Sequence, residues 1–144
     1  MDPCPFCLPA SEDLVWEDGL CRVVRVGGAE GTSFPGFCRV VWRTHVAEMS
    51  DLEPNSRRHL FHVVLAVEAA LRQLLAPDKI NLASLGNQVP HLHWHVVPRW
   101  RDDSHFPAPI WATAVREGRP RYAPATAELR AAIMAVLAEE ESGA

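Results

Sequence analysis

The sequence has little of what marks secreted, membrane-spanning or nucleic-acid-binding proteins. It carries four cysteines in 144 residues, too few for a disulfide scaffold. No apolar run approaches the length of a membrane span, and the first ten residues lack the basic start and apolar stretch of a secretory signal. The net charge of −4 provides no excess of cations for binding nucleic acid. We therefore expect a cytoplasmic protein that binds neither membrane nor nucleic acid.

The composition is that of one globular domain. Hydrophobic residues make up 48% of the chain and charged residues 22%, which is enough for one ordinary core, so we predict a single domain over residues 1–144. Three segments are distinct within it: an N-terminal loop with a Cys-x-x-Cys pair (1–12), a proline-rich segment (98–124) and a C-terminal amphipathic helix (125–141).

Hydrophobic periodicity predicts the other elements. Apolar residues recur at three- and four-residue steps from Pro54 to Pro77, which is typical of a helix. Four glycines in residues 27–36 indicate a loop. Short apolar runs predict strands, the first two of them joined by a tight turn at Asp18-Gly19. The predicted strands fall within residues 13–26, 37–42, 79–85 and 91–97. This order favours an α+β fold, with an antiparallel sheet and helices packed on one face.

Three histidines alternate with apolar residues in the segment PHLHWHVVPRW. On a strand, this alternation places His91, His93 and His95 on one face. Three aligned imidazoles are costly to bury and repel one another once protonated, so function explains them better than packing does. One possibility is a metal site completed by a carboxylate, but no acid lies on the strand. The other is phosphoryl transfer, in which one imidazole attacks phosphorus while its neighbours hold the charged oxygens.

The segment His-Leu-His-Trp-His-Val-Val, residues 91–97, resembles the signature of the histidine-triad (HIT) family. Pro35-Gly36 before an apolar strand, His45-Val46, and Pro98-Arg99 after the triad are similar to the family's usual surroundings. The resemblance implies a five-stranded antiparallel sheet with a long helix, and usually a homodimer. It also implies a nucleotide hydrolase or nucleotidyl transferase, and the chain looks like a bacterial branch often labelled diadenosine-polyphosphate hydrolase-like.

The resemblance implies a role for each histidine of the motif. His93 would be the nucleophile that forms a nucleotidyl-histidine intermediate, with its other ring nitrogen donating to a backbone carbonyl. His95 would bind the α-phosphate oxygens, and His91 would orient the pair or bind metal. His45 corresponds to a fourth histidine near the leaving group in many members.

Polar residues ahead of the triad are candidates for substrate binding. Family members usually have Gln and then Ser or Thr there, whereas this chain has Asn87 and Gln88. An amide can donate to a phosphate oxygen, but the hydroxyl is absent, so the leaving-group preference stays open. Asn81 is a further candidate, because an asparagine inside an apolar strand needs a polar partner. The expected substrates are purine nucleoside phosphates, phosphoramidates or dinucleoside polyphosphates.

A structural zinc ion is the one cofactor that the sequence predicts. Cys4 and Cys7 form a half-site for a tetrahedral ion, and histidines must supply the remaining ligands. His45 follows one predicted strand and His91 opens another, and the chain resembles bacterial members that bind zinc with a similar pair of cysteines. The competing interpretation is two reduced thiols in a mobile N-terminus, which would return His45 and His91 to the catalytic pocket.

Two other functions compete with an enzyme: a nucleotide-binding module with little turnover, and a structural zinc-binding protein. An intact triad disfavours the module, because binding alone needs no nucleophile. We also predict a homodimer, with the helix from Pro54 to Ala76 and a neighbouring strand in the seam. Of the remaining residues, Trp111 and Trp100 could close over a base or the dimer seam, while Cys21 and Cys38 are expected to be buried.

Overall fold

A five-stranded antiparallel sheet forms the centre of the fold. The computed structural model describes residues 3–8 and 12–142, so parts of the predicted N-terminal loop, 1–2 and 9–11, lie outside the described residues, as do residues 143–144. The strands are β1 (Asp13–Glu17), β2 (Cys21–Arg25), β3 (Cys38–Trp42), β4 (Lys79–Ala83) and β5 (His93–Arg99). Their order is β1-β2-β3-β5-β4, which places β1 and β4 at the edges. The predicted α+β fold is confirmed.

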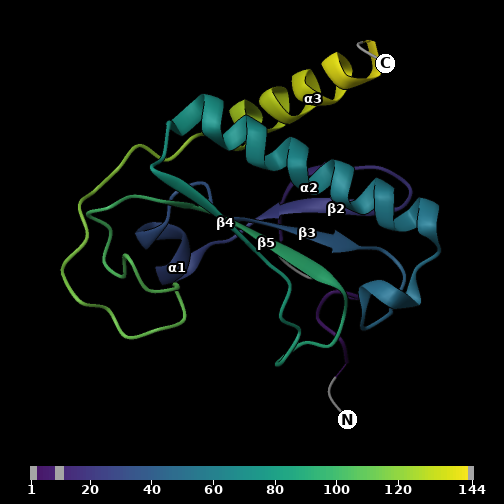
Figure 1. The fold of residues 1–144 in the computed structure, drawn as a ribbon, viewed down its shortest axis with the longest axis horizontal. Coiled ribbons are helices and arrows are strands. Elements are labelled where there is room, and N and C mark those ends of the chain that lie inside the picture. The colour runs from purple at the N-terminus through teal and green to yellow at the C-terminus, as the bar shows by residue number, and fades with distance from the viewer. Residues whose placement is uncertain (1–2, 9–11, 143–144) are drawn as a thin grey trace.

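Two helices, α2 (Pro54–Leu75) and α3 (Thr126–Ser142), cover one face of the sheet (Figure 1). α2 begins at Pro54, which suits the first helical turn. It ends at Ala76, which adopts the left-handed conformation ahead of Pro77. Its buried stripe packs on β3 and β5, and α3 packs on α2 and β1. The stripe consists of Leu60, Val63, Val64, Ala66, Val67, Ala70 and Leu71.

Two sequence predictions about local structure were wrong in part. Residues 27–36, predicted to be a loop, contain the short helix α1 (Gly28–Ser33). One turn forms there despite the glycines, because Phe34 is buried directly after it and anchors the segment. The triad strand begins at His93 rather than His91. The backbone at Leu92 bonds instead to Val46 and Trp42, which draws it away from the regular ladder.

The proline-rich segment lies at the end of the sheet where α1 is found (Figure 1). It contains no helix or strand over residues 100–125. In Figure 1 it forms the long green loop beside α1. Between these two segments and the sheet is a small second core. Its members are Val26, Phe34, Phe37, Val97 and Ile110. Beside it, Arg99 and Asp103 form a buried ion pair, with 2.8 Å between Nε and Oδ2.

The close approach of α2 to the start of β3 requires a glycine. Gly36 has a φ of +93°, and a Cβ there would lie 2.7 Å from Cδ1 of Leu75. Gly36 of the Pro35-Gly36 pair is therefore favoured at this crossing by its positive φ and by the nearby Leu75 side chain.

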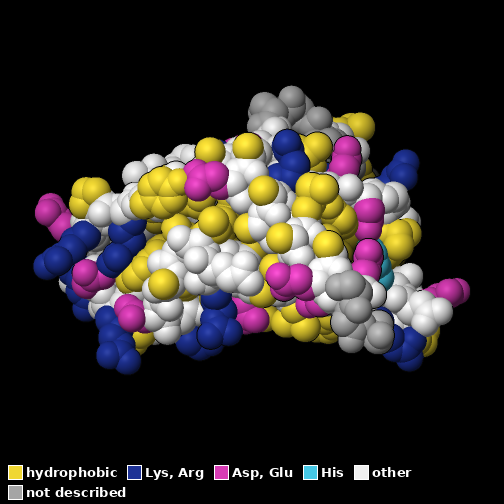
Figure 2. Space-filling model, turned by 90° about the horizontal axis from the view of Figure 1, so that it is seen from above, with side chains coloured by type: hydrophobic (Ala, Val, Ile, Leu, Met, Phe, Trp, Pro, Cys, Tyr) yellow, Lys and Arg dark blue, Asp and Glu magenta, His cyan; other side chains and the backbone are white. Residues whose placement is uncertain are grey.

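The helical face of the molecule carries scattered apolar surface. Figure 2 looks onto this face and shows hydrophobic side chains in patches separated by acidic and basic ones. Phe61 and Leu65 of α2 and Met134 of α3 are among its exposed large side chains. No helix in the described part of the chain is long and apolar enough to cross a membrane.

Candidate active site and metal centre

A cavity of about 650 Å³ opens on the sheet face opposite α2, and the second and third histidines of the triad lie in its wall. The strand β5 supplies both side chains, the loop after β4 supplies a polar rim, and the proline-rich segment supplies an apolar side. The lining residues are Pro5, Phe6, Glu30, Arg39, Leu85, Gly86, Asn87, Gln88, Val89, His93, His95, Ile110 and Trp111.

His93 is held in one orientation and one tautomer. Its Nδ1 donates to the backbone carbonyl of His91 at 2.6 Å, because a carbonyl can only accept. The neutral ring therefore has its lone pair on Nε2, which has no partner among the described residues. Ser84 fixes the backbone at this point by donating to the His93 carbonyl at 2.9 Å. Burial lowers the pKa of His93, so the ring is neutral and nucleophilic near pH 7.

His95 is an unsatisfied polar group in the same wall. It is 6% exposed, and its buried Nδ1 has no hydrogen-bond partner in the part of the chain that the structure describes. Burial, followed by the charges of His93 and Arg39, lowers its pKa to about 4. A neutral imidazole with free hydrogen-bonding capacity at the edge of a cavity suits a ligand that supplies the missing partner.

His91 does not line the cavity but faces the N-terminal cysteines. Its Nε2 donates to the carbonyl of Trp42 at 2.6 Å, which leaves the lone pair on Nδ1. That Nδ1 lies 3.4 Å from Sγ of both Cys4 and Cys7, and 3.1 Å from Nδ1 of His45. Burial lowers the pKa of His91. The ring is thus presented in the form that binds a metal.

The four groups fit a tetrahedral zinc ion. Zn–N bonds of about 2.0 Å and Zn–S bonds of about 2.3 Å place the ligand atoms of a tetrahedron about 3.3–3.8 Å apart. Cys7 Sγ lies 3.3 Å from His45 Nδ1, and the other contacts named above are within a few tenths of an ångström of this range. The geometry brings together Cys4, Cys7, His45 and His91, the four residues that the sequence predicted as ligands.

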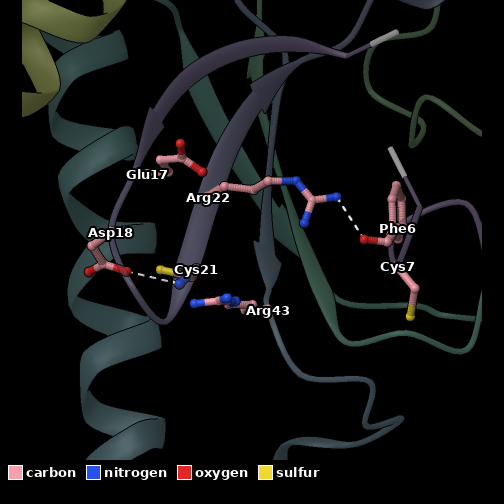
Figure 3. A pocket seen from close by; sticks show the side chains of 7 residues that line it. All are labelled: Phe6, Cys7, Glu17, Asp18, Cys21, Arg22 and Arg43. Carbon is pink, nitrogen blue, oxygen red and sulfur yellow. Dashed lines mark hydrogen bonds between the residues drawn. The ribbon is translucent and has the colours of Figure 1, made fainter. Parts of the chain in front are cut away.

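Arg22 of β2 holds the cysteine loop against the sheet. Its Nη2 donates to the carbonyl of Phe6 at 2.9 Å, as Figure 3 shows, and the same guanidinium is paired with Glu12. This contact borders a second cavity, of about 580 Å³, between the loop and the β1–β2 hairpin. The ring of Phe6 packs against that of His93, with 4.7 Å between the two ring centroids. The loop that carries the cysteines therefore also forms part of the wall of the first cavity.

Other residues predicted from the sequence divide between the cavity and the frame. Asn87 and Gln88 line the cavity, and the ring of Trp111 lies 5.0 Å from that of His95. Asn81 does not line it: its Oδ1 accepts from Nη1 of Arg99 at 2.8 Å. Trp100 is buried under Arg121.

The remaining histidines and buried cysteines have local partners. His59 pairs with Asp18 and His62 with Glu140, while His105 contacts Ser104. The predicted burial of Cys21 and Cys38 is confirmed, and burial raises the pKa of each thiol to about 12.

Phe6 and Arg39 are among the cavity residues that were not identified from the sequence. Phe6 lies between the two cysteines and closes the cavity above His93. Arg39 is the one charged residue of β3, the second of its five residues, and it lines the cavity. A lone arginine in the apolar run Cys38–Trp42 was the available signal, since such a residue must find a partner or a ligand.

The family comparison and the curated relatives place the sequence among histidine-triad proteins. Residues 10–102 match the family model described as HIT domain. A Bacillus subtilis protein named "Protein hit" is 26% identical over 90 residues, which cover 59% of this chain and 61% of that protein. A bis(5'-adenosyl)-triphosphatase of Saccharomyces cerevisiae is 32% identical over 73 residues, or 46% of this chain and 35% of the enzyme. The matched region thus spans less than two thirds of the length of the first relative and about a third of the second.

Solved structures share the fold over most of the chain. A histidine triad protein from Bradyrhizobium japonicum is 27% identical, with a TM-score of 0.65, covering 88% of this chain and 89% of that one. A Zn-bound histidine triad family protein from Mycobacterium smegmatis is 22% identical, with a TM-score of 0.59, covering 98% and 97%.

Proposed function

Because the chain belongs to the HIT family, we propose that it is a nucleotide hydrolase or nucleotidyl transferase that acts through a covalent intermediate on His93. The observation that supports this most directly is the hydrogen bond from Nδ1 of His93 to the carbonyl of His91. It leaves the lone pair of Nε2 for attack, and it stabilises the positive charge that the ring acquires.

The reaction that we propose has two displacements at one phosphorus atom. First, Nε2 of His93 forms a bond to the α-phosphorus, the bond to the leaving oxygen or nitrogen breaks, and the leaving group takes up a proton. Water, or another acceptor, then attacks the same phosphorus, loses a proton, and breaks the P–N bond to release the nucleoside monophosphate. His95 holds a non-bridging oxygen through both steps, and the amides of Asn87 and Gln88, which line the cavity, donate to the substrate.

We further propose that Cys4, Cys7, His45 and His91 hold a structural zinc ion. The fit of the four ligand atoms supports it, as does the hydrogen bond from Nε2 of His91 to the carbonyl of Trp42, which leaves Nδ1 for the metal. The Zn-bound relative from Mycobacterium smegmatis is a precedent for zinc in this fold. The ion would tie the cysteine loop to the ends of β3 and β5. The His91 side chain would then serve the metal, while its carbonyl orients His93.

The substrate class that we propose is purine nucleoside phosphates, with dinucleoside polyphosphates as the first candidates. Support comes from the curated bis(5'-adenosyl)-triphosphatase that shares part of this sequence. The ring of Trp111 beside His95 and the apolar Leu85 and Ile110 give the cavity a surface on which a base can pack.

A substrate panel tests the function. Diadenosine polyphosphates, adenosine phosphoramidate and adenylyl sulfate are incubated with the protein, and release of AMP is measured. We expect turnover of at least one of them, and a loss of about 10³-fold or more for His93→Ala, because a covalent route has no substitute nucleophile. Labelled substrate should mark His93 in a quenched reaction. Near-normal turnover by the folded His93→Ala protein would rule out this mechanism, and binding of AMP without any turnover would favour the binding module.

A further inference from the structure

Arg39 is a cation without a counter-charge in the wall of the cavity. It lies on β3 directly opposite His95 of β5, so the two side chains share one face of the sheet. Its guanidinium carbon lies 6.0 Å from the ring centre of Phe6 and 5.8 Å from that of Phe37. Its Nε is buried and has no hydrogen-bond partner among the described residues. The two rings therefore hold the guanidinium in place without using its N–H donors.

Other partly buried arginines of the sheet are neutralised by carboxylates. Arg22 pairs with Glu12, Arg25 with Asp13, and Arg99 with Asp103. Arg39 forms no ion pair in the described part of the chain, and this includes Glu30, the one carboxylate in the cavity lining. A half-buried cation without a partner is costly, which points to a negatively charged group supplied from outside the chain.

The two buried polar atoms that lack a partner belong to neighbouring residues. Within the described residues, Nε of Arg39 and Nδ1 of His95 are the buried side-chain nitrogen and oxygen atoms with no hydrogen bond, and both residues line the cavity. Such atoms are rare in folded proteins, and two on one cross-strand pair indicate a ligand that completes both.

We propose that Arg39 and His95 form an anion subsite that binds non-bridging phosphate oxygens of the substrate, and that Arg39 determines the preference for anionic substrates. The planar guanidinium can donate two parallel hydrogen bonds to one phosphate, which a histidine alone cannot do. This inference rests on the proposed function, because it names a substrate contact of the same site. The phosphate is either the α-phosphate held by His93 and His95 or the first phosphate of the leaving group.

Binding to a protein that cannot turn over tests the subsite independently of catalysis. In the His93→Ala background, Arg39→Gln is compared with Arg39 by titration calorimetry, with AMP and with inorganic pyrophosphate as separate probes. We expect binding to weaken by about 10- to 100-fold, the loss of a charge-assisted contact. Weaker binding of AMP assigns the contact to the α-phosphate, and weaker binding of pyrophosphate alone assigns it to the first phosphate of the leaving group.

Two further variants guard against indirect effects. Arg39→Lys keeps the charge but not the planar fork, so its affinity for the probes should lie between those of the Arg39 and Arg39→Gln proteins. It replaces the Gln variant if that variant does not fold. Arg72→Gln removes an equal charge from the exposed end of α2 and should change binding less than about twofold. If the folded Arg39 variants match the Arg72→Gln control with both probes, the subsite is overturned, whatever the panel shows about turnover.

Discussion

At the scale of single residues, the protonation of His95 is the most informative property of the site. Burial and two nearby charges lower its pKa to about 4, whereas an unfolded histidine titrates near 6.5. The unfolded chain therefore binds a proton in the window between these values, where the folded chain does not. The contribution to stability is fully present above about pH 6.5, and up to about 3 kcal/mol of it is lost as the pH falls toward 4.

We predict that His95 shows no titration by NMR between pH 5.5 and 8. The free energy of unfolding should also fall less steeply below pH 6.5 in His95→Gln than in the unmodified protein, because the variant lacks this proton linkage. A His95 midpoint near 6.5, with parallel stability curves for the two proteins, would contradict the assignment.

The Arg99–Asp103 ion pair makes a predictable contribution to the free energy of unfolding. Burial alone would raise the pKa of Asp103, but hydrogen bonds from Arg99 and from three backbone N–H groups hold it below its ordinary value. Arg99 is 2% exposed and would keep its charge in a buried site without the carboxylate. Asp103→Asn should therefore lower the free energy of unfolding by about 3–5 kcal/mol, measured by urea denaturation.

The neighbouring Asp102 provides a matched control. It pairs with Arg119 and Arg121 at the surface, where solvent screens the charges. Asp102→Asn should cost less than about 1 kcal/mol. Equal effects of the two substitutions would show that the buried pair does not stabilise the proline-rich segment.

At the scale of elements, the structure of the cysteine loop depends on contacts with residues that are distant in the sequence. Residues 3–8 form neither helix nor strand, and they are held by Arg22 and by the four-ligand cluster. The loop also carries Phe6 to the cavity wall beside His93. Any weakening of the metal cluster should therefore disturb the cavity as well.

We predict about one zinc ion per chain in protein purified without chelators, since four ligands form a closed tetrahedral site. Cys4→Ser and Cys7→Ser should each lower the metal content and the thermal midpoint, measured by elemental analysis and by calorimetry. Cys38→Ala, a change at a buried cysteine outside the cluster, should keep the metal. Zinc well below one per chain, unchanged in the two serine variants, would exclude the site.

At the scale of the whole molecule, one edge of the sheet and part of the helical face are open. Among the strands that the structure describes, β4 pairs with β5 alone, so its other side is an open edge. On α2, Phe61 is 40% exposed and Leu65 is 48% exposed. A two-fold partner that covered α2 and a neighbouring strand would bury this surface, as the predicted homodimer requires.

We predict a mass of twice the 16.0 kDa chain by light scattering at micromolar concentration. Leu65→Asp should shift the protein toward monomer, because a buried carboxylate in the seam would be unpaired. Met134→Asp, at an exposed position of α3 outside the predicted seam, should leave the dimer unchanged. A monomer mass for the unmodified protein would show the prediction to be wrong.

The sequence by itself determined the strands, the long helix and the alternation that puts the triad histidines His93 and His95 on one strand face. Alternation in HLHWHVV and the three- and four-residue steps of α2 are local patterns, and local periodicity fixes which face of an element is apolar. The same patterns did not give the start of β5 or the helix in residues 27–36, because both depend on partners distant in the chain, at Val46 and around Phe34.

Only the tertiary structure decided where the three histidine side chains lie and which groups surround them. The pairing of β3 with β5 places His95 opposite Arg39 and brings His91 beside His45, and Arg22 brings the cysteines to them. Sequence spacing could name candidate ligands but could not separate a metal role for His91 from a catalytic one. The proposed metal role rests on the ring nitrogen that meets the carbonyl of Trp42, a contact between residues 49 positions apart.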